Sequence, residues 1–243
     1  MGKDVIIACD FPSGTQTIEF LEQFNRVSSL ESSNPTGKPF VKIGMELYYA
    51  EGPAIVRELK SRGHKIFLDL KLHDIPNTVR KAMAVLASLD IDMCNVHAGG
   101  TAAMMRAAVE GLTRPDGTRP LLIAVTQLTS TDQQSMERDL LIHDPMPEVV
   151  LHYAQTAASS GLDGVVCSPL EARGVHERCG ENFLTVTPGV RFADGDVGDQ
   201  KRVMTPSQAR DVGSDYIVVG RPITQAPDPV AAYERCVVEF LGA

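Results

Sequence analysis

A lysine stands between two aspartates in the segment Asp69-Leu-Lys-Leu-His-Asp-Ile-Pro76. A lysine ammonium held by carboxylates can stabilise a developing negative charge and then donate a proton to it. The run Lys65-Ile-Phe-Leu-Asp-Leu70 is typical of a strand, and side chains two apart on a strand share a face. We therefore expect Asp69 and Lys71 to point the same way, on a face where a central strand would normally carry another aliphatic residue.

The residues after this strand extend the charged group. Asp74 follows where the strand ends, and Pro76 then opens a predicted helix that continues to about Leu89, as proline in a first turn commonly does. The alternative is a surface ion pair, which contributes little to stability. The apolar residues Leu68, Leu70 and Leu72, expected on the opposite face, argue against that alternative.

Length and composition fit one domain, residues 1–243, of the size of a single α/β barrel, which is about 250 residues. The chain is 43% hydrophobic and 22% charged, and no apolar run approaches the roughly 20 residues of a membrane span. The first residues enter a predicted strand almost at once and leave no room for a signal peptide. Five cysteines without a C-x-x-C pair suit reduced thiols. We therefore expect a cytoplasmic protein.

The net charge of −8 argues against general binding of nucleic acids, which needs a basic surface. The six histidines form neither H-E-x-x-H nor H-x-x-x-H, and no zinc site is indicated. A phosphorylated small substrate would have to be bound by locally placed arginines.

Strand and helix signals alternate along the chain without a break in composition. The predicted strands are Val5–Cys9, Phe40–Gly44, Lys65–Leu70, Ile91–Val96, Leu121–Thr126, Gly164–Cys167, Phe183–Thr187 and Tyr216–Val219. The predicted helices are Thr15–Phe24, Gly52–Arg62, Thr78–Leu89, Thr101–Glu110, Pro147–Ser160, Pro169–Arg178, Pro206–Val212 and Asp228–Leu241. Eight such units predict an α/β fold that closes as a (β/α)8 TIM barrel. A doubly wound open sheet is the alternative, although no G-x-G-x-x-G follows the first strand. Ser28–Lys38 is expected to be an ordinary loop and Ala193–Arg202 a lid.

In such a barrel, the residues at the C-terminal ends of the strands converge on one mouth, where active sites are built. The chain places these groups there: Asp10, Lys42, Asp69, Lys71, His97, Thr129, the run Pro188-Gly-Val-Arg191, and Gly220-Arg221. Any one of them taken alone could have a structural role, because polar groups usually satisfy neighbouring backbone or solvent. Their coincidence at one mouth indicates an active site.

The residues Asp69-Leu-Lys-Leu-His-Asp-Ile-Pro-Asn-Thr-Val79 resemble the signature of the orotidine 5′-phosphate decarboxylase family, whose members make UMP from orotidine monophosphate. Further segments are similar to family segments, in family order, and extend the resemblance over nearly all of the chain: Val-Lys-Ile-Gly44, Asn-Val-His-Ala-Gly-Gly100, Val-Thr-Gln-Leu-Thr-Ser130, Thr-Pro-Gly-Val-Arg191, Val-Met-Thr-Pro206 and Val-Val-Gly-Arg-Pro-Ile223.

The resemblance implies a homodimer whose active sites are shared. Lys42, Asp69 and Lys71 would come from one subunit, and Asp74, Ile75 and Thr78 from the other. Lys71 would stabilise and protonate the carbanion that forms at C6 of the pyrimidine. Asp69 and Asp74 would hold its ammonium in place, and Lys42 would continue the network. The scheme needs no cofactor and no metal.

The resemblance also implies how the rest of the nucleotide is bound. Gly220 and Arg221 would bind the phosphate, which matches the habitual phosphate site of such barrels after strands seven and eight. The other implied substrate contacts are Asp10 with the ribose, Thr129 with the pyrimidine amide edge, Pro188, and Arg191 and Gln200 closing over the phosphate. His97 is expected to have a structural role.

Two alternatives remain. Metal-dependent decarboxylases or aldolases of the same superfamily, which act on sugar phosphates, share the D-x-K-x-x-D core. They carry a carboxylate where this chain has Lys42. The second alternative is a catalytically silent barrel that binds a nucleotide, because a fold alone does not prove a function.

Overall fold

The computed structural model describes residues 3–26, 37–193 and 204–242. Its strands form one closed barrel, in which each strand pairs in parallel with the next and β8 returns to β1. The strands are β1 (Asp4–Ala8), β2 (Phe40–Gly44), β3 (Ile66–Leu72), β4 (Met93–His97), β5 (Leu121–Val125), β6 (Gly164–Val166), β7 (Leu184–Thr187) and β8 (Tyr216–Val219). This topology confirms the predicted (β/α)8 barrel.

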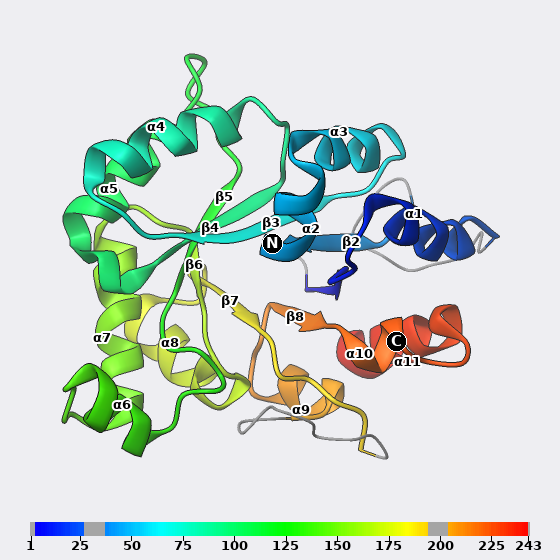
Figure 1. The fold of residues 1–243 in the computed structure, drawn as a ribbon. Coiled ribbons are helices and arrows are strands. Elements are labelled where there is room, and N and C mark those ends of the chain that lie inside the picture. Colours follow the sequence, from blue (N-terminus) through cyan, green and yellow to red (C-terminus); the bar gives the residue numbers. More distant parts are fainter. Residues whose placement is uncertain (1–2, 27–36, 194–203, 243) are drawn as a thin grey trace.

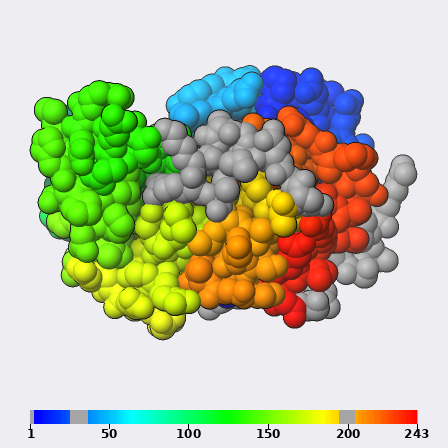
Figure 2. Space-filling view, turned by 90° about the horizontal axis from the view of Figure 1, so that it is seen from below, coloured from blue at the N-terminus to red at the C-terminus, as the bar shows by residue number. Residues whose placement is uncertain are grey.

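Helices alternate with the strands and cover the outside of the barrel (Figure 1). They are α1 (Gly14–Glu22), α2 (Met45–Glu51), α3 (Pro53–Ser61), α4 (Pro76–Ala87), α5 (Thr101–Leu112), α6 (Gln133–Leu140), α7 (Met146–Ser159), α8 (Ala172–Cys179), α9 (Pro206–Asp211), α10 (Arg221–Thr224) and α11 (Pro229–Leu241). Short 3-10 turns are η1 (Gln23–Arg26), η2 (Ala98–Gly100) and η3 (Pro169–Glu171). In Figure 2, the green region that contains α6 lies at one side of the face shown and the red α11 at the other.

Three of these helices, α2, α6 and α10, are missing from the sequence-based prediction. They are short, with 7, 8 and 4 residues. Leu47 is the one buried residue of α2, and Met136 is the one buried residue of α6. Each of the three buries a single residue, which is too few to show an apolar stripe with helical spacing and explains the omission. The similarly short α8 and α9, which were predicted, bury more than one.

The barrel has two layers of core. Alternate strand residues point inward and pack against each other: Ile6, Ala8, Phe40, Phe67, Met93, Ile123, Leu184, Val186, Tyr216 and Val218. The residues between them point outward and form a larger core with the helices. Toward the C-terminal ends of β2, β3 and β4 the inward residues become polar, and Lys42, Asp69 and Asn95 are all buried there. Buried charges need partners, so this end of the barrel is where a site is expected.

Three aspartates fasten the opposite, N-terminal edge of the barrel, and we call them the strand-end carboxylates. Each directly precedes an even-numbered strand and accepts a hydrogen bond from a backbone N–H at the start of the strand before it: Asp92 from Ile66 at 2.7 Å, Asp163 from Leu122 at 2.7 Å, and Asp215 from Thr185 at 2.8 Å. Each also contacts a basic side chain, which is Lys60, Arg119 or His176, respectively.

None of the five cysteines, all of which lie in the described ranges, is joined in a disulfide. Burial raises the pKa of Cys9 and of Cys94 to about 12, so both thiols stay protonated at neutral pH. Among the helices of the described ranges, none is long and apolar enough to cross a membrane.

Candidate active site

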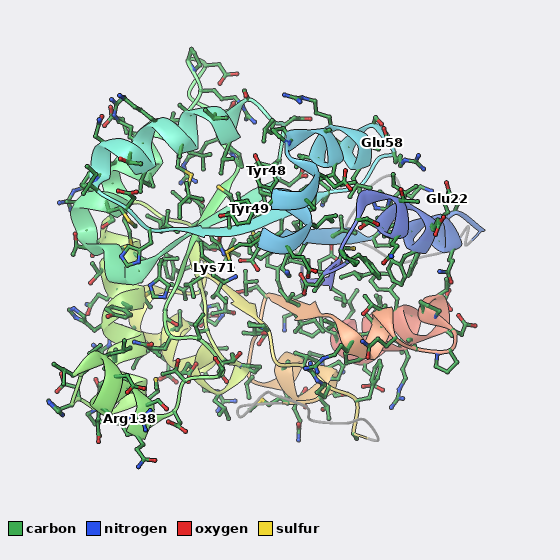
Figure 3. All side chains as sticks on the ribbon, viewed as in Figure 1. Glu22, Tyr48, Tyr49, Glu58, Lys71 and Arg138 are labelled. Carbon is green, nitrogen blue, oxygen red and sulfur yellow. The ribbon has the colours of Figure 1, made fainter. Side chains whose placement is uncertain are left out.

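Lys42 on β2 and Asp69 and Lys71 on β3 meet inside the barrel near its C-terminal end. Nζ of Lys71 lies 2.7 Å from Oδ1 of Asp69, and Nζ of Lys42 lies 3.5 Å from Oδ2 of the same carboxylate. Figure 3 shows Lys71 near the centre of the molecule, whereas Arg138 on α6 lies at its periphery. The ion pair confirms that Asp69 and Lys71 share a face.

The charges of this group support each other. Burial by itself would raise the pKa of Asp69, but the ammonium groups of Lys42 and Lys71, with hydrogen bonds from Lys71 and Asn95, hold that pKa below its ordinary value. Burial would likewise lower the pKa of Lys42, yet the carboxylates of Asp69 and Asp10 raise it above its ordinary value. Both Asp69 and Lys42 are therefore charged at neutral pH.

Asp10, which follows β1, extends the network to the surface. Its Oδ1 lies 2.8 Å from Nζ of Lys42. Gly44 at the end of β2 makes room for this pair, because a Cβ at Gly44 would lie 2.8 Å from Oδ1 of Asp10 and 3.1 Å from Nζ of Lys42. The four charged groups thus form one chain, Asp10–Lys42–Asp69–Lys71, that runs from the rim into the barrel.

A cavity of about 210 Å³ opens beside this chain of charges. Lys42, Asp69 and Lys71 line one part of it, and Thr129 and Pro188 also line it. Its remaining wall is largely apolar: Phe67, Val125, Leu128, Val166, Val186 and Val218. A flat ring could pack against this apolar wall while charged groups reach one of its edges.

The strand that carries Lys71 is irregular at this point. β3 continues to Leu72, two residues beyond its predicted end, and its register against β4 shifts between Leu68 and Leu72. Lys71 has φ +53°, a left-handed conformation that a lysine seldom adopts. Its backbone N–H donates a hydrogen bond to Oδ1 of Asn95, at 2.8 Å.

Asp74, Ile75 and Thr78 are all exposed, and none of the three lines this cavity. The Asp74 carboxylate accepts a hydrogen bond from the N–H of Ile75 at 2.6 Å, and the Ile75 side chain is 67% exposed. An exposed isoleucine between an exposed carboxylate and the first turn of α4 is available for contact with another molecule.

The residues expected to bind phosphate lie at the ends of β7 and β8. Gly220 directly precedes α10 and Arg221 is its first residue, exposed to solvent. The Arg191 guanidinium donates a hydrogen bond to the carbonyl of Val190 at 2.8 Å. Gln200, most of the predicted lid and most of the predicted loop Ser28–Lys38 lie outside the described residues.

His97 lies at the end of β4. Its Nδ1 accepts a hydrogen bond from the backbone N–H of Gly99 at 3.2 Å, and its ring stacks on that of His73 with 5.5 Å between centroids. Burial, with His73 and Lys71 nearby, lowers the pKa of His97. The bond to Gly99 is the kind of contact that a structural role predicts.

Three polar residues of the site, Asn95, Gln127 and Ser130, are not among those predicted from the sequence, and Ser130 lines the cavity. Asn95 is fully buried and donates a hydrogen bond to Asp69 at 2.7 Å. Gln127 is 5% exposed and lines the cavity. Strand alternation could have indicated Asn95, since it places Asn95 on the same face as His97. In the part of the chain that the structure describes, no group of three or more His, Cys, Asp or Glu residues is placed to hold a metal ion.

A closed (β/α)8 barrel with a network of lysines and carboxylates around a cavity at the C-terminal ends of its strands has the architecture of a barrel enzyme. The chain belongs to the family described as Orotidine 5′-phosphate decarboxylase / HUMPS, whose model matches residues 3–236.

Several curated relatives are similar over almost their whole length. The orotidine 5′-phosphate decarboxylase of Geobacillus sp. (strain WCH70) is 54% identical and aligns over 100% of this chain and 98% of its own. That of Enterococcus faecalis is 56% identical over 95% of this chain and 94% of its own. The crystal structure of orotidine 5′-phosphate decarboxylase from Lactobacillus acidophilus matches with a TM-score of 0.84 and 43% identity, covering 98% of this chain and 99% of that one.

Proposed function

We propose that this protein decarboxylates orotidine 5′-monophosphate to UMP and CO2, the last step of de novo pyrimidine nucleotide synthesis. The observation that carries the proposal is the Lys42–Asp69–Lys71 network beside the cavity. The relatives at 54% and 56% identity, which carry the name of this activity, support it.

The chemistry needs a fixed positive charge at the reacting carbon. When the bond between C6 of the pyrimidine and its carboxylate breaks, CO2 leaves and the electron pair stays on C6. No adjacent carbonyl delocalises this carbanion well, so the Lys71 ammonium stabilises it electrostatically. Lys71 then donates a proton to C6, which replaces the lost CO2 and gives UMP.

The neighbouring charges hold Lys71 in place. Asp69, at 2.7 Å, orients the ammonium, and Lys42 balances the second oxygen of that carboxylate. Asp74 of a partner subunit approaches Lys71 from the other side. Because an apolar wall faces these charges, their fields are screened less than they would be in water.

The remaining groups bind the nucleotide. Gly220 and Arg221 bind the phosphate, with Arg191 and Gln200 closing over it. Asp10 binds ribose hydroxyls, Thr129 binds the amide edge of the pyrimidine, and Pro188 packs beside the ring. Contacts to the phosphate, which is remote from C6, can drive closure of the site before chemistry.

The working unit in this proposal is a homodimer with two shared sites, formed by residues 1–243 as one catalytic domain in the cytoplasm. The exposure of Asp74, Ile75 and Thr78 supports the shared site, because these residues are free to reach a second copy. A two-fold interface would give both sites the same composition.

One assay separates this function from its alternatives. Purified protein treated with a chelator is mixed with orotidine 5′-monophosphate, and the loss of its absorbance is followed. We expect rapid decarboxylation without added metal. Activity that appears only with a divalent metal and a sugar phosphate would instead favour the related metal-dependent enzymes, and no reaction with either substrate would favour a silent nucleotide-binding barrel.

A further inference from the structure

The irregular end of β3 leaves a gap in the hydrogen bonding with β4. Leu68 pairs with Cys94 and Leu72 pairs with Val96, so three residues of β3 face only Asn95 on β4. A bulge of this kind removes backbone partners from the extra residues. The side chain of Asn95 replaces one of them, because its Oδ1 accepts the hydrogen bond of the Lys71 N–H at 2.8 Å.

The other end of the same side chain binds the catalytic carboxylate. Nδ2 of Asn95 donates to Oδ1 of Asp69 at 2.7 Å, and the same oxygen lies 2.7 Å from Nζ of Lys71. The contacts fix which way the amide points, since a flipped amide would set N–H against N–H and oxygen against carboxylate. Asn95 is 0% exposed, so water does not compete for either bond.

These contacts close a ring that begins and ends at one residue. It runs from the Lys71 backbone through Asn95 to Asp69 and back to the Lys71 ammonium. The ring ties the left-handed backbone of Lys71, at φ +53°, to the position of its own side chain. A non-glycine residue stays in that conformation only when its surroundings hold it there.

We propose that Asn95 is the positioning residue of this site: it fixes the Asp69 carboxylate and the Lys71 backbone together, so that the Lys71 ammonium is presented to the reacting carbon. This inference rests on the proposed decarboxylation. Asn95 acts through Asp69 and Lys71 and has no contact with substrate in the proposal.

The two bonds require an asparagine. Aspartate has the same shape and can still accept from the Lys71 N–H, but it puts a second carboxylate oxygen where Nδ2 donates to Asp69. Leucine has a similar volume and makes neither bond. The variants Asn95→Asp and Asn95→Leu therefore separate loss of the donor from loss of both bonds. Cys94→Ala is the matched control, because Cys94 is also buried on β4 but faces the helices.

The first readout is the kinetics of decarboxylation against pH. We expect kcat of Asn95→Asp and Asn95→Leu to fall by about 10- to 100-fold, the range for a lost hydrogen bond to a charged group, with KM changing far less. Asn95 helps to keep the pKa of Asp69 low, so its removal raises that pKa. The acidic limb of the rate profile should therefore move toward neutral pH, further in Asn95→Asp because two carboxylates then share a site. Cys94→Ala should keep the parent profile.

The second readout does not depend on turnover. The carboxyl carbon of Asp69, followed by NMR in the free protein, should titrate at higher pH in both Asn95 variants than in the parent. Folded Asn95→Asp with unchanged kcat, acidic limb and Asp69 titration would overturn the inference and leave Asn95 a packing residue. If the parent failed to decarboxylate orotidine monophosphate while the titration of Asp69 still shifted, the proposed function would be wrong and the contact to Asp69 would stand.

Discussion

Asp69 links the other polar side chains of the proposed site to one another. One of its oxygens meets Lys71 and Asn95, and the other faces Lys42. A carboxylate buried with these partners is held ionised, and it in turn fixes where the ammonium groups lie. The proposed catalytic power therefore depends on the geometry around one side chain.

Lys71→Ala should reduce decarboxylation by more than about 100-fold, because the variant loses both the charge that stabilises the carbanion and the proton donor. The fold should survive, since Lys71 belongs to the edge of the cavity and not to either apolar core. Turnover of orotidine monophosphate and circular dichroism measure the two effects. Lys81→Ala, an exposed lysine on α4, is the control. A residual rate within about tenfold of the parent, only about 1.4 kcal/mol in the barrier, would refute the role of Lys71.

Arg221→Ala should lower kcat/KM for orotidine monophosphate by roughly 10- to 100-fold, because a guanidinium bonded to phosphate contributes about 1.5–3 kcal/mol. Turnover of the nucleoside that lacks phosphate should hardly change. Steady-state kinetics with both substrates measure the difference, and Arg106→Ala on α5 is an exposed control. An equal loss with both substrates would mean that Arg221 does not bind phosphate.

Residue types and their spacing predicted the charged residues of the network, Asp10, Lys42, Asp69 and Lys71. The pairing of Asp69 with Lys71 follows from strand alternation, and the structure confirms it. Asn95 was missed because an amide in the run Met-Cys-Asn-Val-His97 carries no charge and resembles a buried structural group. Its partners are 24 and 26 residues away along the chain, so nothing in its own sequence neighbourhood indicates them.

Among the elements, β3 shows a feature that regular strand alternation does not predict. Alternation predicts the faces of Asp69 and Lys71 but treats the strand as evenly spaced. The bulge against β4 and the φ of +53° at Lys71 depend on both strands together. The helices α2, α6 and α10 were missed for a related reason, since each buries only one residue and its pattern resembles that of a polar loop.

The strand-end carboxylates give a stability prediction. Asp92→Ala should lower the free energy of unfolding by about 1–3 kcal/mol, because it leaves the Ile66 N–H and Lys60 without this partner. Asp92→Asn should cost less, since its amide oxygen can still accept from Ile66. Denaturation in urea measures both.

The control is Asp90→Asn. Asp90 lies 3.9 Å from the same lysine, but its side chain is 86% exposed. Asparagine also tolerates the left-handed conformation found there, at φ +53°. We expect a change within about 0.5 kcal/mol, as for other exposed pairs. A loss in Asp90→Asn as large as that in Asp92→Ala would show that the contact to Ile66 is unimportant.

For the whole molecule, the order of the elements could be predicted because each strand and its helix are adjacent in sequence, and parallel pairing then leaves few arrangements. The expected family is confirmed by the family match. The assembly of subunits does not follow from the order of the elements. The exposed residues Asp74, Ile75 and Thr78 are accessible to a second copy, and this accessibility is the basis for the test below.

Mixed dimers test the shared site. Asp74→Asn and Lys71→Ala homodimers should each be nearly inactive. After subunit exchange, a heterodimer would hold one site with both defects and one with neither, as a two-fold interface requires. Random mixing of equal amounts makes half of the dimers hybrid, so about a quarter of all sites should recover activity.

Exchange has to be verified separately with tagged subunits. Heterodimers purified with two tags and showing no more activity than the parents would place Asp74 in the site of its own subunit. Recovery close to a quarter of the wild-type activity would support the shared site.

The strand-end carboxylates also join six of the eight strands into three pairs. Asp92 joins β4 to β3, Asp163 joins β6 to β5, and Asp215 joins β8 to β7. Each contact joins two strands that follow each other in the chain, so the loop that it closes is short and the entropic cost of closing it is low. In a circularly permuted chain, new ends between β4 and β5 or between β6 and β7 would keep all three contacts local, whereas new ends between β5 and β6 would turn the Asp163 contact into one between distant parts of the chain. The molecule is thus best opened at connections that lie outside the β3–β4, β5–β6 and β7–β8 pairs.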